Sequence, residues 1–192
     1  MAAALVFWVA GCAPEPPATV QPCALSSPTA VPGSDDPRVH KAQLDHHLNR
    51  SEAEYRVTLE SVMGIIDDCL YERTPTTYAG SFLDQERGVV VVLSADTDST
   101  RVAVSRFFDP DRIDVRAARW SLGVLQDARG MVDRSLRGKA GYIATRVDVP
   151  DNGLVVELHD SPDGHTLASQ EPLHSREIPV EDGLALDVRF SR

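Results

Sequence analysis

The sequence lacks the patterns that identify several large classes of protein. It contains three cysteines and no Cys-x-x-Cys pair, so neither a zinc site nor a dithiol redox site is indicated. It has no glycine-rich phosphate-binding loop and no Gly-x-Ser-x-Gly turn, which leaves nucleotide binding and the α/β-hydrolase nucleophile without support. A Ser-His-Asp triad is defined by geometry rather than by spacing, and nothing in the sequence argues for one.

Positive charge is also scarce. Lys and Arg number 19 against 29 Asp and Glu, which gives a formal net charge of −10 at pH 7. Nucleic acid and anionic lipid both attract clustered Lys and Arg, so we expect neither partner to be held by charge. Because 42% of the 192 residues are hydrophobic, the chain can bury a core, and we expect one domain with extensions.

Histidines and carboxylates are present, but they are not arranged as a metal or catalytic site. Adjacent His46 and His47 point to different faces of a helix and cannot both bind one ion without distortion. Asp67, Asp68 and Glu72 lie near a predicted helix end, where carboxylates are usually solvated. We therefore expect no metal, no cofactor and no enzymatic activity, with a hydrolase of unrecognised site as the alternative. The other histidines and the serines outside any catalytic motif are His40, His159, His165, His174, Ser81, Ser94, Ser99 and Ser121.

The N-terminus has features of a secretion signal. Residues 1–10 are apolar but too short to span a bilayer, which takes about 20 residues. Val9-Ala10-Gly11-Cys12 resembles the lipobox of bacterial lipoproteins, which implies a signal peptide over residues 1–11 and a diacylglycerol group on the Cys12 thiol. No Lys or Arg precedes Cys12, so a cytoplasmic protein with a chance apolar start is the alternative.

The next segment has the composition of a tether. Residues 12–37 are rich in Pro, Ala, Ser and Thr, which is typical of a disordered linker. A lipid anchor followed by a tether predicts an extracytoplasmic protein attached to a bacterial cell membrane. Each CH₂ of an acyl chain buried in the bilayer contributes about 0.8 kcal/mol to membrane binding, so the acyl chains would hold the protein there. In an oxidising compartment, Cys23 and Cys69 could pair and fasten the tether to the first long helix. Alternatively, Cys69 is a buried small hydrophobe and Cys23 is a free thiol.

Apolar spacing predicts the first half of the folded part. A short helix is expected over 38–48. A longer helix follows, with Ser51 and Glu54 as its capping box and an end near Tyr71. The stretch from Thr74 to Ser94 reads as a β-hairpin, with Gly88 in the turn and Gly80 at a bulge or close approach. The run of residues 89–93 is apolar on both sides of the pleat, so both faces should be covered, at least partly by helices.

The second half alternates in the same way. We expect a helix from Ser99 or Thr100 to about residue 108, a strand over 113–117, and a helix capped by Ser121 that ends near Leu136. A second hairpin spans 143–149 and 154–158, because Asn152-Gly153 is a strong turn signal. The predicted class is α+β: a two-layer α/β sandwich over 38–160, with hairpins packed against helices. Residues 161–192 are expected to be a strand and loop extension, with a turn at 161–164 and strands at 178–180 and 184–190.

Taken in order, these elements resemble the pro-region of secreted bacterial chymotrypsin-like serine proteases, the alpha-lytic protease and streptogrisin group. The stretches that carry the resemblance are Ser51–Arg56, Pro75–Asp84, Arg146–Val156 and, more weakly, Trp120-Ser121-Leu122. The resemblance implies a domain that assists folding of a protease and then inhibits it, through sheet pairing and a C-terminal tail. No Gly-Asp-Ser-Gly-Gly is present, so protease chemistry is not carried over.

These features together predict a lipid-anchored binding protein without enzymatic activity. Its expected partner is a trypsin-like serine protease supplied in trans, or another envelope protein. A structural envelope lipoprotein without a specific ligand is the third hypothesis.

Overall fold

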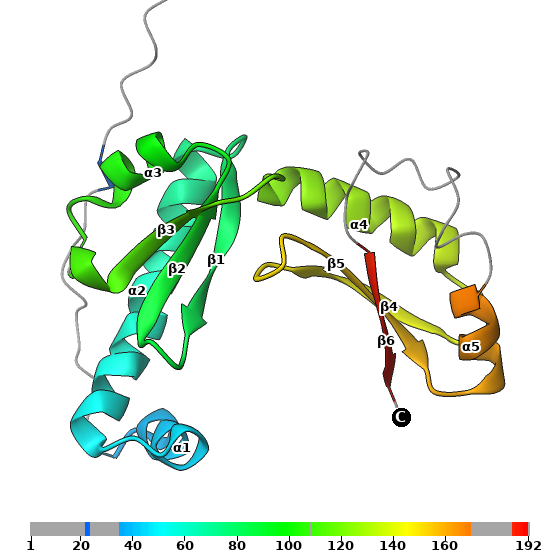
Figure 1. Ribbon diagram of the computed structural model, residues 1–192, viewed down its shortest axis with the longest axis horizontal. Helices are drawn as coiled ribbons and strands as arrows, with labels where there is room; N and C mark the ends of the chain where they lie inside the picture. Colours follow the sequence, from blue (N-terminus) through cyan, green and yellow to red (C-terminus); the bar gives the residue numbers. More distant parts are fainter. Residues whose placement is uncertain (1–21, 24–34, 108, 170–185, 192) are drawn as a thin grey trace, which may run out of the picture.

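The structure is a computed structural model, and it describes residues 22–23, 35–107, 109–169 and 186–191. It has a mixed α+β fold in which hairpins pack against helices, as the sequence predicts. Figure 1 shows two lobes side by side, joined where strand β3 leads into helix α4. Each lobe contains one three-stranded sheet with helices on one face.

The first lobe begins with two helices and a hairpin. Its elements are α1 (Pro37–His46), α2 (Arg50–Arg73), β1 (Tyr78–Asp84), β2 (Val89–Ser94), α3 (Thr97–Val104), a short 3-10 turn (Pro110–Arg112) and β3 (Ile113–Ala117). Strand β2 pairs antiparallel with β1 and parallel with β3. The predicted hairpin and the predicted strand over 113–117 are both confirmed.

Two helix caps differ from the prediction. Helix α2 is capped by Asn49, whose side chain accepts a hydrogen bond from the Glu52 amide at 2.9 Å, and not by Ser51. Helix α3 is capped by Asp96, whose carboxylate accepts from the Ser99 amide at 3.1 Å. Asn and Asp cap helices as well as Ser does, so the sequence offered neighbouring candidates of similar strength.

Strand β2 is buried on both faces. Val90 and Val92 pack against α2 and α3. The opposite face, called here the outward face, carries Val91 and Leu93, which are also buried. Ala118 and Val149 pack there, so chain segments from the junction with the second lobe cover this face instead of a helix.

The second lobe repeats the pattern. Its elements are α4 (Leu122–Leu136), β4 (Tyr142–Asp148), β5 (Gly153–His159), α5 (Pro162–Ser169) and β6 (Leu186–Ser191). The Ser121 cap and the second hairpin are confirmed, since Ser121 Oγ accepts from the Val124 amide and β4 pairs antiparallel with β5. Its core joins α4 residues to Leu154, Val156 and Leu158 of β5.

The tail differs from the expected extension. Residues 161–164 do not form an isolated turn, because Pro162 begins helix α5 and Ser161 Oγ accepts from the Gly164 amide at 3.2 Å. Strand β6 agrees with the strand expected over 184–190, and it pairs parallel with β5 as the third strand of the sheet. The expected boundary at residue 160 is therefore not a boundary of the fold. The strand expected over 178–180 lies outside the described residues.

The two lobes are a structural duplication of helix, hairpin, helix and strand. Hairpin positions correspond at a constant offset of 64 residues, from Tyr78 and Tyr142 to Ser94 and Leu158. Both hairpins have a bulge just after the tyrosine, and both turns place a residue with positive φ before the second strand, Gly88 at 62° and Asn152 at 47°. The parallel third strand joins at the same register in both sheets.

Candidate functional site

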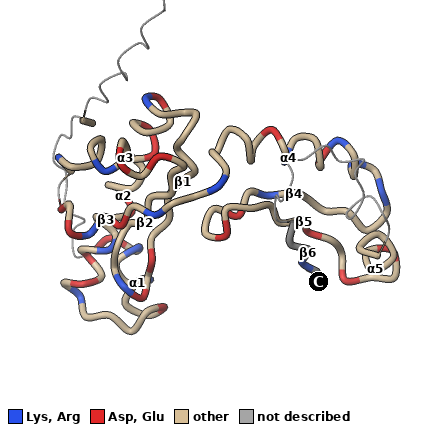
Figure 2. The backbone as a smooth tube through the Cα atoms, turned by 45° about the horizontal axis from the view of Figure 1, so that its top comes forward, with Lys and Arg blue, Asp and Glu red and all other residues tan. Residues whose placement is uncertain are grey.

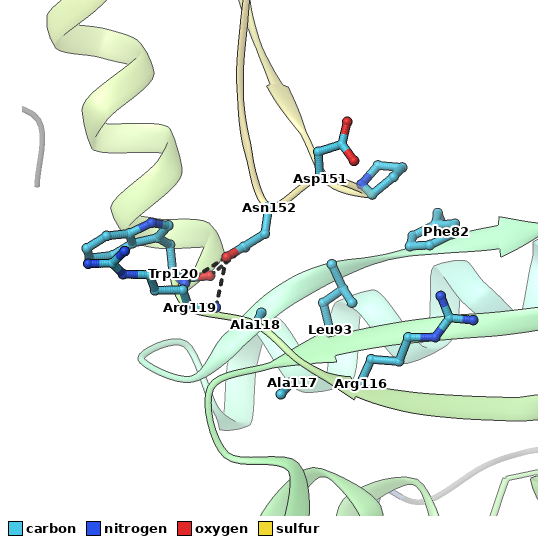
Figure 3. A pocket seen from close by; sticks show the side chains of 10 residues that line it. Phe82, Leu93, Arg116, Ala117, Ala118, Arg119, Trp120, Asp151 and Asn152 are labelled. Carbon is cyan, nitrogen blue, oxygen red and sulfur yellow. Dashed lines mark hydrogen bonds between the residues drawn. The ribbon is translucent and has the colours of Figure 1, made fainter. Parts of the chain in front are cut away.

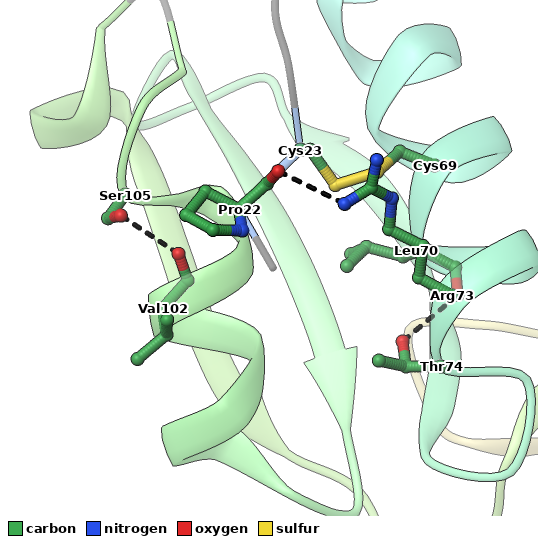
Figure 4. The surroundings of a disulfide bond; sticks show 8 residues. All are labelled: Pro22, Cys23, Cys69, Leu70, Arg73, Thr74, Val102 and Ser105. Atoms are coloured by element: carbon green, nitrogen blue, oxygen red, sulfur yellow. Dashed lines mark hydrogen bonds between the residues drawn. A yellow bond between two sulfur atoms is a disulfide. The ribbon is translucent and has the colours of Figure 1, made fainter. Parts of the chain in front are cut away.

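The cysteine predictions have different outcomes. Cys12 lies outside the described residues. Cys23 and Cys69 form a disulfide with a Cα–Cα distance of 6.2 Å (Figure 4). Of the two alternatives for this pair, the structure therefore has the disulfide and not the free thiols.

The disulfide belongs to a three-point attachment of residues 22–23. The Cys23 amide donates to the Ala103 carbonyl on α3 at 2.9 Å, and the Arg73 guanidinium donates to the Pro22 carbonyl at 3.1 Å. Cys23 is 1% exposed and packs in the core of the first lobe. The chain just after the expected lipid attachment site is thus fixed to both α2 and α3.

The junction between the lobes depends on a close approach at Gly80. This glycine has a φ of +111°, and a Cβ there would lie 2.8 Å from Val149 Cγ1 in the turn of the second hairpin. A side chain at position 80 would therefore be strained by its backbone conformation and would also collide with Val149. The bulge or close approach expected at this glycine is confirmed in both senses.

Asn152 holds the segment that connects the lobes. Its side-chain oxygen accepts from the amides of Arg119 and Trp120 at 3.0 and 2.8 Å, and its side-chain nitrogen donates to the Trp120 carbonyl at 2.9 Å (Figure 3). Three polar backbone groups of the connection are satisfied by one side chain. The turn of the second hairpin thereby fixes the start of α4.

One side of the junction is a groove of about 380 Å³, called here the junction groove. Phe82, Leu93 and Ala118 form apolar parts of its lining, and Arg116 lies along it (Figure 3). Arg116 pairs with Asp114 at 2.9 Å. The hydrogen bond from Arg87, followed by that from Arg116, holds the pKa of Asp114 below its usual range.

A second cavity at the junction is lined by carboxylates, whereas the junction groove is lined by Arg116 and Arg119. This aspartate pocket, of about 320 Å³, is lined by Asp67, Asp68, Tyr71, Tyr78, Gly80, Ser81, Leu122, Gln126 and Val149. Asp68 is exposed, as expected for a carboxylate near a helix end. Asp67 is different, because it accepts hydrogen bonds from the hydroxyls of Tyr78 and Ser81 and is only partly exposed.

Three of the four tyrosines donate their hydroxyl to an aspartate. Tyr55 donates to Asp109 at 2.6 Å, Tyr142 donates to Asp133, and Tyr78 donates to Asp67. Burial and the hydrogen bond to Asp109 raise the pKa of Tyr55 to about 12. Burial, and then the bond to Asp67, also raise the pKa of Tyr78.

The remaining predicted candidates have structural roles or no assigned role. Ser99 bonds to Asp96, Ser121 caps α4, and the Thr100 hydroxyl donates to Ser94 Oγ at 2.8 Å. His165 lies 3.0 Å from Asp160, and His174 is outside the described residues. Within the described ranges, no three His, Cys, Asp or Glu side chains are grouped as metal ligands, and no helix is long and apolar enough to cross a membrane.

A scan against models of known protein families finds no match to this chain, and a search of curated proteins finds none either.

Proposed function

We propose that this protein is a lipid-anchored extracytoplasmic binding protein without enzymatic activity, and that it inhibits or helps to fold a trypsin-like serine protease supplied in trans. The observation that supports this most is the meeting of the pro-region-like stretches at the lobe junction. Gly80 of the Pro75–Asp84 stretch touches Val149 of the Arg146–Val156 stretch, and Asn152 binds Trp120 of the weaker match. Residues that lie far apart in the sequence thus hold the two lobes together. Because these stretches act jointly, their contacts support the resemblance better than each weak match does alone.

The disulfide supports the extracytoplasmic location. Disulfides persist mainly in oxidising compartments, and this one joins residues that are 46 apart in the sequence. If Cys12 carries the lipid, residues 13–22 are the only chain between the anchor and the attachment at Cys23. Ten residues span at most about 36 Å, so the first lobe would stay close to the membrane.

Metabolic labelling tests the anchor directly. A bacterial host that expresses the chain with a labelled fatty acid should incorporate label into the wild-type protein and none into Cys12→Ala. Equal labelling of both proteins, or of neither, would contradict lipid attachment at Cys12.

Sheet pairing is the expected mode of binding. Among the residues that the structure describes, each sheet has two edge strands, β1 and β3 in the first lobe and β4 and β6 in the second. An edge strand presents backbone donors and acceptors to which a partner strand can bind. The pro-region resemblance implies recognition of this kind.

Titration of protease activity tests the partner. Protein spanning residues 13–192, which keeps Cys23, would be added to a panel of secreted chymotrypsin-like proteases while peptide hydrolysis is followed. Stoichiometric, saturable inhibition is expected for at least one protease, or faster recovery of activity when that protease refolds. If folded protein has neither effect on any protease, this partner is excluded and a structural envelope role gains ground.

The hydrolase alternative has its own control. The same protein, without protease, should not hydrolyse ester or peptide substrates above the background rate. Hydrolysis that co-purifies with the folded chain would contradict the proposal of a binding protein without enzymatic activity.

A further inference from the structure

In the second lobe, an arginine accompanies the Tyr142–Asp133 pair. The Asp133 carboxylate on α4 accepts the Tyr142 hydroxyl on Oδ1. Its other oxygen, Oδ2, lies 3.4 Å from the Arg137 guanidinium, one helical turn further along. The Tyr142 hydroxyl also contacts Thr145 Oγ1 at 2.9 Å. A carboxylate, two hydroxyls and a guanidinium thus form one set.

The Tyr55–Asp109 pair has a guanidinium as well. The Arg112 guanidinium carbon lies 5.4 Å from the centre of the Tyr55 ring, within the range of a cation–π contact. Two independent Tyr–Asp pairs of this chain are therefore each accompanied by an arginine.

In the described part of the chain, the equivalent set of the first lobe has no arginine or lysine. Asp67 on α2 accepts from Tyr78 at the start of the hairpin, as Asp133 accepts from Tyr142. Three residues after the tyrosine, Ser81 donates to Asp67 itself, whereas Thr145 contacts the Tyr142 hydroxyl. Both bonds to Asp67 end on Oδ1. At the position of Arg137, four residues after the aspartate, the first lobe has Tyr71. Among the residues that the structure describes, neither Asp67 nor Asp68 forms an ion pair.

The missing cation coincides with open space. The aspartate pocket holds about 320 Å³ beside Asp67, and Tyr71, which is 50% exposed, lines it together with Asp68. Val149 and Gln126 of the second lobe line it as well. Two carboxylates next to an aromatic ring make a favourable site for a planar cation, which can donate charge-assisted hydrogen bonds to the carboxylates and stack on the ring at the same time.

We propose that the aspartate pocket binds a guanidinium group, namely the side chain of an arginine on the surface of a partner protein. The group would take the place on Asp67 that Arg137 takes on Asp133, with Asp68 as a second acceptor and Tyr71 as a stacking surface. A metal ion fits less well, because no third potential metal ligand is grouped with these two aspartates among the described residues. The site does not depend on the partner being a protease.

A blocked peptide with one arginine is the direct probe. Protein spanning residues 13–192, labelled with ¹⁵N, would be titrated with acetyl-Gly-Arg-Gly-amide and followed by NMR. Saturable shifts are expected at the amides of Asp68, Tyr71, Ser81 and Val149, with weaker binding at higher salt. The matched peptide with citrulline, which has the same shape without the charge, should bind at least roughly tenfold more weakly, because a charged hydrogen bond is lost.

Two exposed positions provide the variants, so that folding is not at risk. Asp68→Asn should weaken binding roughly tenfold. Tyr71→Arg should abolish it, because the new guanidinium lies four residues after Asp67 and fills the site from within. Tyr71→Gln, which is uncharged, should keep weaker binding and so separates loss of the ring from occupation of the site.

Three results would overturn the proposal. They are equal binding of the citrulline peptide, unchanged binding by Tyr71→Arg, and no shifts at the pocket amides with 10 mM peptide in a protein whose spectrum shows it to be folded. Shifts of equal size around Asp133 would show that the peptide binds exposed carboxylates in general, which also contradicts a specific site.

Discussion

The two lobes have the same order of helices and strands, but they differ in the side chains on the outward faces of their sheets. At equivalent positions on the outward faces, the first lobe has Phe82 and Leu93 and the second has Arg146 and Glu157, which pair with each other. The first outward face contacts the junction, whereas the second is finished with its own charges. Figure 2 shows acidic and basic residues interspersed along both lobes.

The comparison separates features that the two lobes share from features that only the first lobe has. The frame of paired strands is kept in both lobes, and so is one ion pair: the aspartate that ends the first hairpin strand meets an arginine on the third strand, at 3.9 Å for Asp84–Arg116 and 2.8 Å for Asp148–Arg189. Positions outside the frame diverge. The first lobe has the disulfide, the glycine approach and two aspartates that form no ion pair with any described residue, so its candidate sites are found where the lobes differ.

Loss of the disulfide should have the largest effect, and it should fall on the first lobe. A closed loop of 46 residues corresponds to about 4 kcal/mol on the chain-entropy estimate. Cys23→Ala with Cys69→Ala should lower the free energy of unfolding by about that amount in urea. Wild-type protein measured under reducing conditions is the control, and it should approach the variant. A double variant as stable as oxidised wild type would contradict a structural role for the bond.

A side chain at the Gly80 bulge should have the second-largest effect, and it should be specific to the first lobe. Gly80→Ala places a Cβ against Val149 in a positive-φ conformation, so a loss of about 1–3 kcal/mol in unfolding free energy is expected. The equivalent residue, Ala144, already carries a side chain, and Ala144→Gly should cost less than about 1 kcal/mol. Similar losses for the two variants would show that the close approach of the lobes is unimportant.

Exchange of the turn residues tests the junction itself. Asn152→Gly installs the residue that the first lobe has at Gly88, keeps the positive φ, and removes three hydrogen bonds to the connection. We expect a loss of about 1–2 kcal/mol, with faster amide exchange at Arg119 and Trp120. Unchanged exchange at these two amides would mean that the start of α4 is fixed without Asn152.

The Tyr–Asp pair of the second lobe should produce a smaller, pH-dependent effect. The hydrogen bond from Tyr142 lowers the pKa of Asp133, so the folded state favours the ionised carboxylate. Its contribution is present above the unfolded-state pKa of about 3.9 and is lost as the pH falls through the lower, folded-state pKa. Asp133→Asn should therefore cost about 1 kcal/mol at pH 7 and less at pH 2.5, measured by urea unfolding. An equal cost at both values would contradict this linkage.

Local signals in the sequence were sufficient for both hairpins and for α4. The valine run, the Asn-Gly turn and the Ser121 cap act over a few residues, so their outcome is decided locally. Helix α5 was missed because Ser-Pro-Asp-Gly favours both a turn and a helix start, and the choice depends on the packing of Leu167 into the second core. The duplication was missed because it rests on few shared residues, such as Tyr78 with Tyr142 and the strands beginning at Ile113 and Leu186.

The candidate sites were less accessible from the sequence. The disulfide was one of two open alternatives, because spacing alone does not bring Cys23 to Cys69. Nothing in the sequence indicated the aspartate pocket, since Asp67 looked like an ordinary solvated residue at a helix end. Its walls come from α2, β1, α4 and the second turn, and no local pattern joins those four segments.

The sequence by itself determined most of the secondary elements, the fold class and the acidic charge, because propensity and turn signals act between near neighbours. The tertiary structure decided the parallel pairing of β3 with β2 and of β6 with β5, the meeting of Gly80 with Val149, and the convergence of four segments around Asp67. These outcomes join residues tens of positions apart. They depend on how the two lobes pack, and the energies involved are sums over contacts that no single stretch of sequence contains.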